Sequence, residues 1–226
     1  MANTRAPTAH GTPFERSAFS GRSPHCGTCS AKQSQPPHFP GYDYATFYIS
    51  DLGAPSIGEF QGRMLHSILP AVMNAGFIGS GVLFYFGMLL FVPLLENTGA
   101  AAVLLIFGML HAAGIAFVGL VNGSPENEKL GLLAIHGLRA ISAIVAGNLA
   151  AITSRFTLAE LRPPAWYRGA DPILGLCSAL LLVLHAGLPD GTWERGSVYT
   201  FMVWELLTGL TLTFLFSSHT SQLSRH

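Results

Sequence analysis

The stretch LGLLAIHGLRAISAIVAGNLAAI, Leu130 to Ile152, decides the fold class of this chain. It exceeds the roughly 20 apolar residues that a helix needs to cross a ~30 Å hydrocarbon core. Within it His136 and Arg139 lie three residues apart, so a helix presents both on nearly the same face. A charge at the bilayer centre costs about 2.5–3.5 kcal/mol on insertion scales, so this face is predicted to turn toward other helices.

Composition indicates a membrane protein rather than a soluble one. The chain has 226 residues, of which 50% are hydrophobic and 11% charged, with a mean hydropathy of +0.42. Soluble domains carry about 25% charged residues. Five apolar stretches predict an all-α, polytopic transmembrane helix bundle of five spans. They are residues 66–95, 99–121, 130–154, 172–188 and 198–218.

The chain divides into four predicted regions: a disordered polar tail (1–39), an extracytoplasmic loop with an ISDLG motif (40–65), the transmembrane helix bundle (66–218) and a cytoplasmic tail (219–226). The first region is rich in Ser, Thr, Pro and Gly, which is typical of disorder. Its Cys26 and Cys29 lack the context of a zinc or thioredoxin site. An inert tail is favoured, with weak metal or redox chemistry as the alternative.

Loop charge predicts the orientation. Arg155, Arg162 and Arg168 follow the third apolar stretch, whereas the short loops on the other side hold only Lys129 and Arg195. Positively charged loops stay in the cytoplasm. We therefore expect a multi-pass protein of the cell (plasma) membrane with a cytoplasmic C-terminus and the ISDLG loop outside.

The position of each polar residue along its predicted span places most of the intramembrane polar groups in the outer half of the bundle. At ~1.5 Å per residue, Arg139 and Glu205 fall at matching depths, which predicts that each is the counter-ion of the other. We expect an outer-leaflet vestibule that binds a ligand. Its residues are Asp51, Asn74, His136, Arg139, His185, Glu194, Arg195 and Glu205. The alternatives are that the Arg–Glu pair only fixes helix register and that Asp51 only caps a helix.

Histidines raise the question of metal chemistry. Bis-His haem ligation needs two histidines at one depth on facing helices, and His136 and His185 come closest. A zinc site from His136, His185 and Glu205 has suitable ligand types, but no H-x-x-x-H spacing supports it. We therefore expect no metal and no cofactor.

Four motifs carry a family resemblance: YISDLGAPSIGEF, HSILPAVMNAGFIGSGVLF, the segment from Gly119 to Ile152, and GTWERGSVYTFMVWELL. They resemble an uncharacterised bacterial and archaeal integral-membrane family, domain of unknown function 998. More loosely, the chain is similar to the Frag1/DRAM/Sfk1 membrane proteins, some of which are linked to lipid handling. The resemblance implies six helices with both ends cytoplasmic and no established activity. The helix that precedes the ISDLG loop in that pattern is missing here, where residues 1–39 stand instead.

These observations favour a protein without enzymatic activity that binds a membrane lipid or small amphiphile in the vestibule. A homo-oligomer or a membrane-protein partner is a further expectation. Twelve basic and twelve acidic residues cancel, so no field attracts nucleic acid. Two alternatives remain: a metal-assisted intramembrane lipid hydrolase using His136, His185 and an acid, and a small-solute or proton-coupled transporter.

Overall fold

The computed structural model of this chain describes residues 40–183 and 187–223. The predicted tail of residues 1–39 and His185 lie outside the described residues. The elements follow one another along the chain as η1 (Ile49–Gly53), β1 (Ile57–Phe60), β2 (Arg63–His66), α1 (Pro70–Phe91), η2 (Val92–Leu94), α2 (Thr98–Leu120), α3 (Pro125–Lys129), α4 (Leu133–Leu158), η3 (Ala159–Leu161), α5 (Ala165–Val183) and α6 (Asp190–Leu223).

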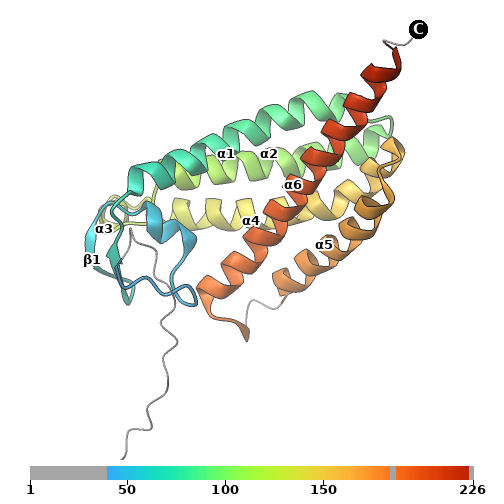
Figure 1. The fold of residues 1–226 in the computed structure, drawn as a ribbon. Helices are drawn as coiled ribbons and strands as arrows, with labels where there is room; N and C mark the ends of the chain where they lie inside the picture. Colours follow the sequence, from blue (N-terminus) through green and yellow to red (C-terminus); the bar gives the residue numbers. More distant parts are fainter. Residues whose placement is uncertain (1–39, 184–186, 224–226) are drawn as a thin grey trace, which may run out of the picture. The chain divides into compact units, whose positions relative to one another are not determined.

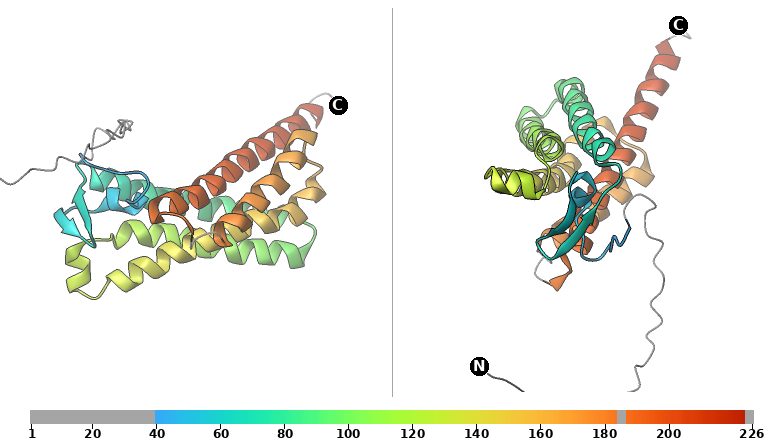
Figure 2. Two further views of the ribbon diagram at one scale, coloured as in Figure 1. Left: turned by 90° about the horizontal axis from the view of Figure 1, so that it is seen from below. Right: turned by 90° about the vertical axis from the view of Figure 1, so that its left-hand side faces the viewer.

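Long helices make up most of the described chain, and α2 packs between α1 and α4 (Figure 1). Helix α6 runs obliquely across α4 and lies alongside α5 (Figures 1 and 2). Within the described residues, four helical segments are long and apolar enough to cross a membrane: Pro70–Leu94, Thr98–Leu120, Leu133–Leu161 and Asp190–Leu215. The predicted all-α membrane bundle is therefore confirmed, and the protein is a multi-pass membrane protein.

The fifth predicted span stays a prediction. Helix α5 begins at Ala165 rather than at Pro172, which lies inside the helix. Its first turns therefore include Arg168 and Asp171, and within the described residues α5 is not among the four segments that qualify as spans. The charged start makes α5 more polar than the sequence range 172–188 suggested.

Small residues allow close packing of the central helices. A Cβ at Gly114 of α2 would lie 2.9 Å from the Arg139 oxygen and from the Ala143 nitrogen of α4. A Cβ at Gly119 would lie 2.6 Å from the Asn74 oxygen of α1. Such backbone approach drives helix association in lipid, where no hydrophobic force acts between helices.

Residues 40–69, here called the cap, cover one end of the bundle (Figure 1). The sequence predicted an irregular loop, but part of it forms an antiparallel hairpin in which Phe60 pairs with Arg63. Gln61 and Gly62 both have positive φ (50° and 75°), as a two-residue type I′ turn requires. Asn-Gly is the usual sequence signal for this turn, whereas this chain has Gln61-Gly62, so the sequence does not predict the hairpin.

The cap has a small apolar core of its own. Tyr42, Ala54, Phe60 and Leu65 are almost fully buried in it, separate from the apolar cluster between the helices. Leu133, the first residue of α4, packs against this cap core. The start of α4 therefore lies directly under the cap.

The start of α6 also differs from the expectation. The sequence placed Glu194 and Arg195 in an outer loop, but α6 begins at Asp190 and both residues lie in its first two turns. An acidic residue in the first turn, here Asp190, favours a helix N-terminus. The other helix end also extends further than predicted, to Leu223.

Candidate functional site

Arg195 fastens the cap to α6. Its side chain is 7% exposed, and Nη1 donates to the carbonyl oxygens of Tyr44 (2.8 Å), Phe47 (2.7 Å) and Gly191 (2.8 Å). Nη2 donates to the Tyr42 hydroxyl. A guanidinium suits this position because its planar fork serves several acceptors at once.

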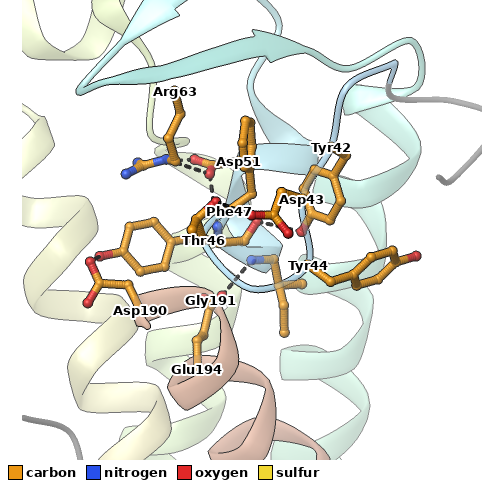
Figure 3. Close-up of polar contacts among 12 residues, drawn as sticks. Tyr42, Asp43, Tyr44, Thr46, Phe47, Asp51, Arg63, Asp190, Gly191 and Glu194 are labelled. Atoms are coloured by element: carbon orange, nitrogen blue, oxygen red, sulfur yellow. Dashed lines mark hydrogen bonds and ion pairs between the residues drawn. The ribbon is translucent and has the colours of Figure 1, made fainter. Parts of the chain in front are cut away.

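Further hydrogen bonds join the cap and α6. A Glu194 carboxylate oxygen, Oε2, accepts the backbone N–H of Ile49 at 2.5 Å, at the start of η1. The Tyr48 hydroxyl donates to Asp190 at 2.8 Å, and the Thr192 N–H donates to the Ala45 carbonyl at 3.0 Å. Figure 3 shows several of these residues at the cap–α6 contact. Burial and the bond to Asp190 raise the pKa of Tyr48 to about 12, so the hydroxyl stays a donor.

Asp51 of the ISDLG motif has two roles. Its Oδ2 accepts the N–H of Tyr48 at 2.9 Å, which caps η1, and it accepts Nε of Arg63 at 2.9 Å (Figure 3). The second contact is the only ion pair within 4 Å in residues 40–183 and 187–223. Burial raises the pKa of Asp51, while the Arg63 guanidinium acts in the opposite direction. The cap bond that the alternative assigned to Asp51 is present, but Asp51 also forms an ion pair and so does not only cap a helix.

Asn74, a residue of α1, holds the ISDLG turn against that helix. Its Nδ2 donates to the Gly53 carbonyl at 2.9 Å. A Cβ at Gly53 would collide with Oδ1 of Asn74, so the motif needs glycine at this position. Asn74 therefore positions η1 and does not line the cavity described below.

His136 bonds to the connection that follows α2. Its Nδ1 lies 2.5 Å from the Val121 carbonyl oxygen, and because a carbonyl only accepts, Nδ1 carries the hydrogen. In the neutral ring Nε2 is then an acceptor, which lies close to Gly123. The side chain is 8% exposed.

A cavity of about 460 Å³ lies between the cap, α4 and the start of α6. Its polar lining comes from all three parts. These residues are Tyr48, Ser50, Asp51, Gln61, Arg63, His136 and Glu194. Three of the eight predicted vestibule residues, Asp51, His136 and Glu194, are therefore brought together here.

The rest of the lining is mainly apolar. Five residues of α4 line it at helical spacing: Gly137, Ala140, Ile141, Ile144 and Val145. Phe60 of the hairpin, Leu133 and Trp193 of α6 complete the apolar wall. From His136 to Val145 the stripe runs about 13 Å along α4, away from the cap. The cavity thus has a polar end and an apolar arm.

The predicted pairing of Arg139 with Glu205 is wrong. The Arg139 guanidinium lies 5.0 Å from the ring centre of Phe117 on α2, and its buried Nε has no hydrogen-bond partner among the described residues. The described part of the chain shows no hydrogen bond or ion pair for Glu205. Equal depth did not bring them together because Arg139 faces α2, whereas α6 packs against α4 and α5.

His136 and Arg139 do share a face, as predicted. Both lie against the C-terminal end of α2, where His136 contacts Val121 and Arg139 contacts Phe117. Of the remaining predicted residues, Arg195 supports the cap and does not line the cavity, and neither do Arg139 and Glu205.

The described residues offer no evident set of metal ligands. Residues 40–183 and 187–223 contain no group of three His, Cys, Asp or Glu side chains close enough to hold an ion. His111 lies between helices, with Nδ1 2.8 Å from the Ala143 oxygen and its ring 4.2 Å from that of Phe201. The zinc alternative keeps His136 in the cavity, but Glu205 does not line it and His185 is outside the described residues.

Sequence reasoning missed Arg63, Tyr48 and the α4 stripe as site residues. The stripe had a usable signal, since small and β-branched residues recur at positions three and four apart from Gly137 to Val145. Arg63 and Tyr48 had none, because only the folded cap brings Arg63 to Asp51 and places the Tyr48 ring beside Arg63 and its hydroxyl on Asp190 of α6.

Comparison with known proteins gives one finding. Residues 35–211, most of the chain, match the family model described as "Protein of unknown function (DUF998)". No curated protein and no solved structure matches the chain significantly. The looser similarity to the Frag1/DRAM/Sfk1 group has no support among these comparisons.

Proposed function

The chain belongs to the DUF998 family of membrane proteins of unknown function, and from its geometry we propose that it binds a lipid or small amphiphile. The observation that carries the proposal is the cavity under the cap, with charged groups at one end and an apolar arm along α4. An amphiphile has the same two-part chemistry.

Size and surroundings support this proposal. Ligand pockets usually measure 300–1,000 Å³ and combine an apolar lining with few polar groups, as the 460 Å³ cavity does. The polar end lies at the cap, where the spans end, and the arm runs beside a membrane-length helix. A bound headgroup would thus lie at interface depth and its chain within the bilayer.

Filling the apolar arm tests the proposal. Gly137 lines the cavity, and a Cβ there meets nothing within 4 Å, so Gly137→Phe places a ring in the arm without displacing backbone. We expect binding of a 12-carbon amphiphile to weaken roughly tenfold or more, since two buried methylene groups account for that much affinity. Native mass spectrometry in mild detergent measures the bound fraction.

Gly87→Phe is the matched control. Gly87 is an exposed glycine of α1, again with nothing within 4 Å of a Cβ, and it lies outside the cavity lining. This variant should bind as the wild type does. Equal binding by Gly137→Phe and Gly87→Phe would exclude the arm as the ligand site.

We further propose that the cap faces the cell exterior, in the plasma membrane, and that the C-terminus is cytoplasmic. Arg155, Arg162 and Arg168 lie around the α4–α5 connection, at the opposite end of α4 from the cap. Positively charged short loops favour the cytoplasm. The cavity would then open in the outer leaflet.

Thiol labelling of intact cells tests this orientation. In a variant whose native cysteines are replaced by serine, Ile57→Cys on the 70% exposed hairpin position should react with a membrane-impermeant maleimide. Glu96→Cys in the α1–α2 connection should react only after lysis. The reverse pattern would invert the topology.

A further inference from the structure

The charges at the polar end of the cavity do not cancel. Asp51 is paired with Arg63, with Nε–Oδ2 at 2.9 Å and Nη2–Oδ1 at 3.5 Å. Glu194 is 7% exposed and accepts only the backbone N–H of Ile49 among the hydrogen bonds of the described residues. No Lys, Arg or His nitrogen of residues 40–183 and 187–223 lies within 4 Å of it.

Arg195 does not neutralise this carboxylate within the cavity. Although it follows Glu194 in the chain, its guanidinium is directed to three backbone carbonyls and the Tyr42 hydroxyl. It does not line the cavity, whereas Glu194 does. A buried carboxylate without a paired cation is costly, so a cationic ligand group would stabilise this end.

An anionic headgroup would find no available partner of comparable strength. Arg63, the arginine in the lining, already donates twice to Asp51 and lies 4.6 Å from the Tyr48 ring centre. Binding an anion there would require breaking this pair or adding a third negative charge beside Asp51 and Glu194.

Aromatic residues in the lining also suit a cation. Phe60 lines the cavity beside the hairpin turn, and Trp193 lines it from α6. Trp193 Nε1 donates to the Leu181 carbonyl at 2.7 Å, which holds the indole in place. Ring faces attract ammonium groups, more strongly where water is excluded.

We infer that the amphiphile carries a cationic amine or quaternary ammonium group, held by Glu194 against the Phe60 and Trp193 rings. This inference rests on the proposed amphiphile-binding function and specifies its ligand class. The apolar arm binds the chain whatever the headgroup, and Glu194 selects the charge.

The test uses three probes with the same 12-carbon chain: dodecyltrimethylammonium, dodecyl phosphate and uncharged dodecanol. Each is titrated into the full-length protein in neutral detergent, with calorimetry as the readout. We expect the cation to bind roughly tenfold more tightly than the phosphate, since a bond to a charged group contributes about that factor. Glu194→Gln should remove this preference while keeping an acceptor for the Ile49 N–H.

Two further variants complete the design. Glu59→Gln makes the same change at an exposed hairpin position outside the cavity and should leave the preference intact. Glu194→Asp keeps the charge and should keep most of the preference, which separates loss of charge from misfolding. The wild-type probe series is decisive even if Glu194→Gln does not fold.

The outcomes distinguish the two proposals. Equal binding of all three probes, tighter binding of the phosphate, or an unchanged preference in Glu194→Gln would overturn the cationic headgroup and leave amphiphile binding in place. If none of the three probes binds, the proposed function fails and the headgroup inference fails with it.

Discussion

Arg195→Met releases the cap from α6. The substitution keeps most of the apolar stem but removes the donors to the Tyr44, Phe47 and Gly191 carbonyls and to the Tyr42 hydroxyl. Each buried acceptor left without a partner costs about 1–3 kcal/mol, so we expect a loss of ~3–5 kcal/mol in the free energy that docks the cap. Hydrogen exchange of residues 42–53 measures this loss, as a gain of roughly a hundred-fold to a few thousand-fold in amide exchange, since about 1.4 kcal/mol is a factor of ten.

Arg195→Lys should lie between the wild type and Arg195→Met. An ammonium is a point charge and does not span the four acceptors as the guanidinium fork does. Arg168→Met makes the same change at an exposed arginine of α5, and its exchange should match the wild type. Unchanged protection of the cap in Arg195→Met would show that this network does not hold the cap.

Gly114→Val separates α2 from α4. A Cβ at Gly114 lies 2.9 Å from both the Arg139 oxygen and the Ala143 nitrogen, which are the two ends of an α4 backbone hydrogen bond. Neither atom can move without distorting the helix. We expect a destabilisation of about 3 kcal/mol or more, at the upper end for overpacked sites, measured by thermal unfolding in detergent.

Alanine and valine substitutions at Gly114 and at a control glycine test whether lost packing causes the destabilisation. Gly114→Ala should destabilise less than Gly114→Val, since only one methyl group enters the contact. Gly76, an exposed α1 glycine with nothing within 4 Å of a Cβ, gives the matched pair Gly76→Ala and Gly76→Val. Gly76→Ala should be neutral or stabilising, because alanine is the better helix former. Equal effects at Gly76 and Gly114 would mean that helix propensity, not packing, is responsible.

How far along a helix a polar residue lies follows from the sequence, but the direction of its side chain around the helix follows only in part. Three of the eight predicted site residues, Asp51, His136 and Glu194, line one cavity. Arg139 was placed at the right end of α4 but faces α2 instead of Glu205. Rise per residue follows from the helix itself, whereas the neighbour a side chain meets depends on how each helix is rotated in the bundle.

The positions of Glu194 and Arg195 could not be predicted from the sequence either. The two adjacent charged residues in GTWERGS predict a loop, because charges are costly inside a membrane helix. The structure accommodates them in α6, where Glu194 accepts the backbone N–H of Ile49 and Arg195 donates to the carbonyls of Tyr44 and Phe47. These partners lie about 150 residues away in the chain, beyond the reach of any local pattern.

The sequence alone determined that the chain is a multi-pass membrane protein, where four of its helices run, and that its family is DUF998. Hydropathy and length suffice for the spans, since a bilayer of fixed thickness imposes the same requirement on each of them. The family follows instead from the match of residues 35–211 to its model. Only the tertiary structure decided that a hairpin carries Arg63 to Asp51, that α6 begins under the cap, and that an apolar arm on α4 leads to the buried carboxylate of Glu194. Those contacts join segments distant in sequence, and folding selects them by mutual burial and hydrogen bonding.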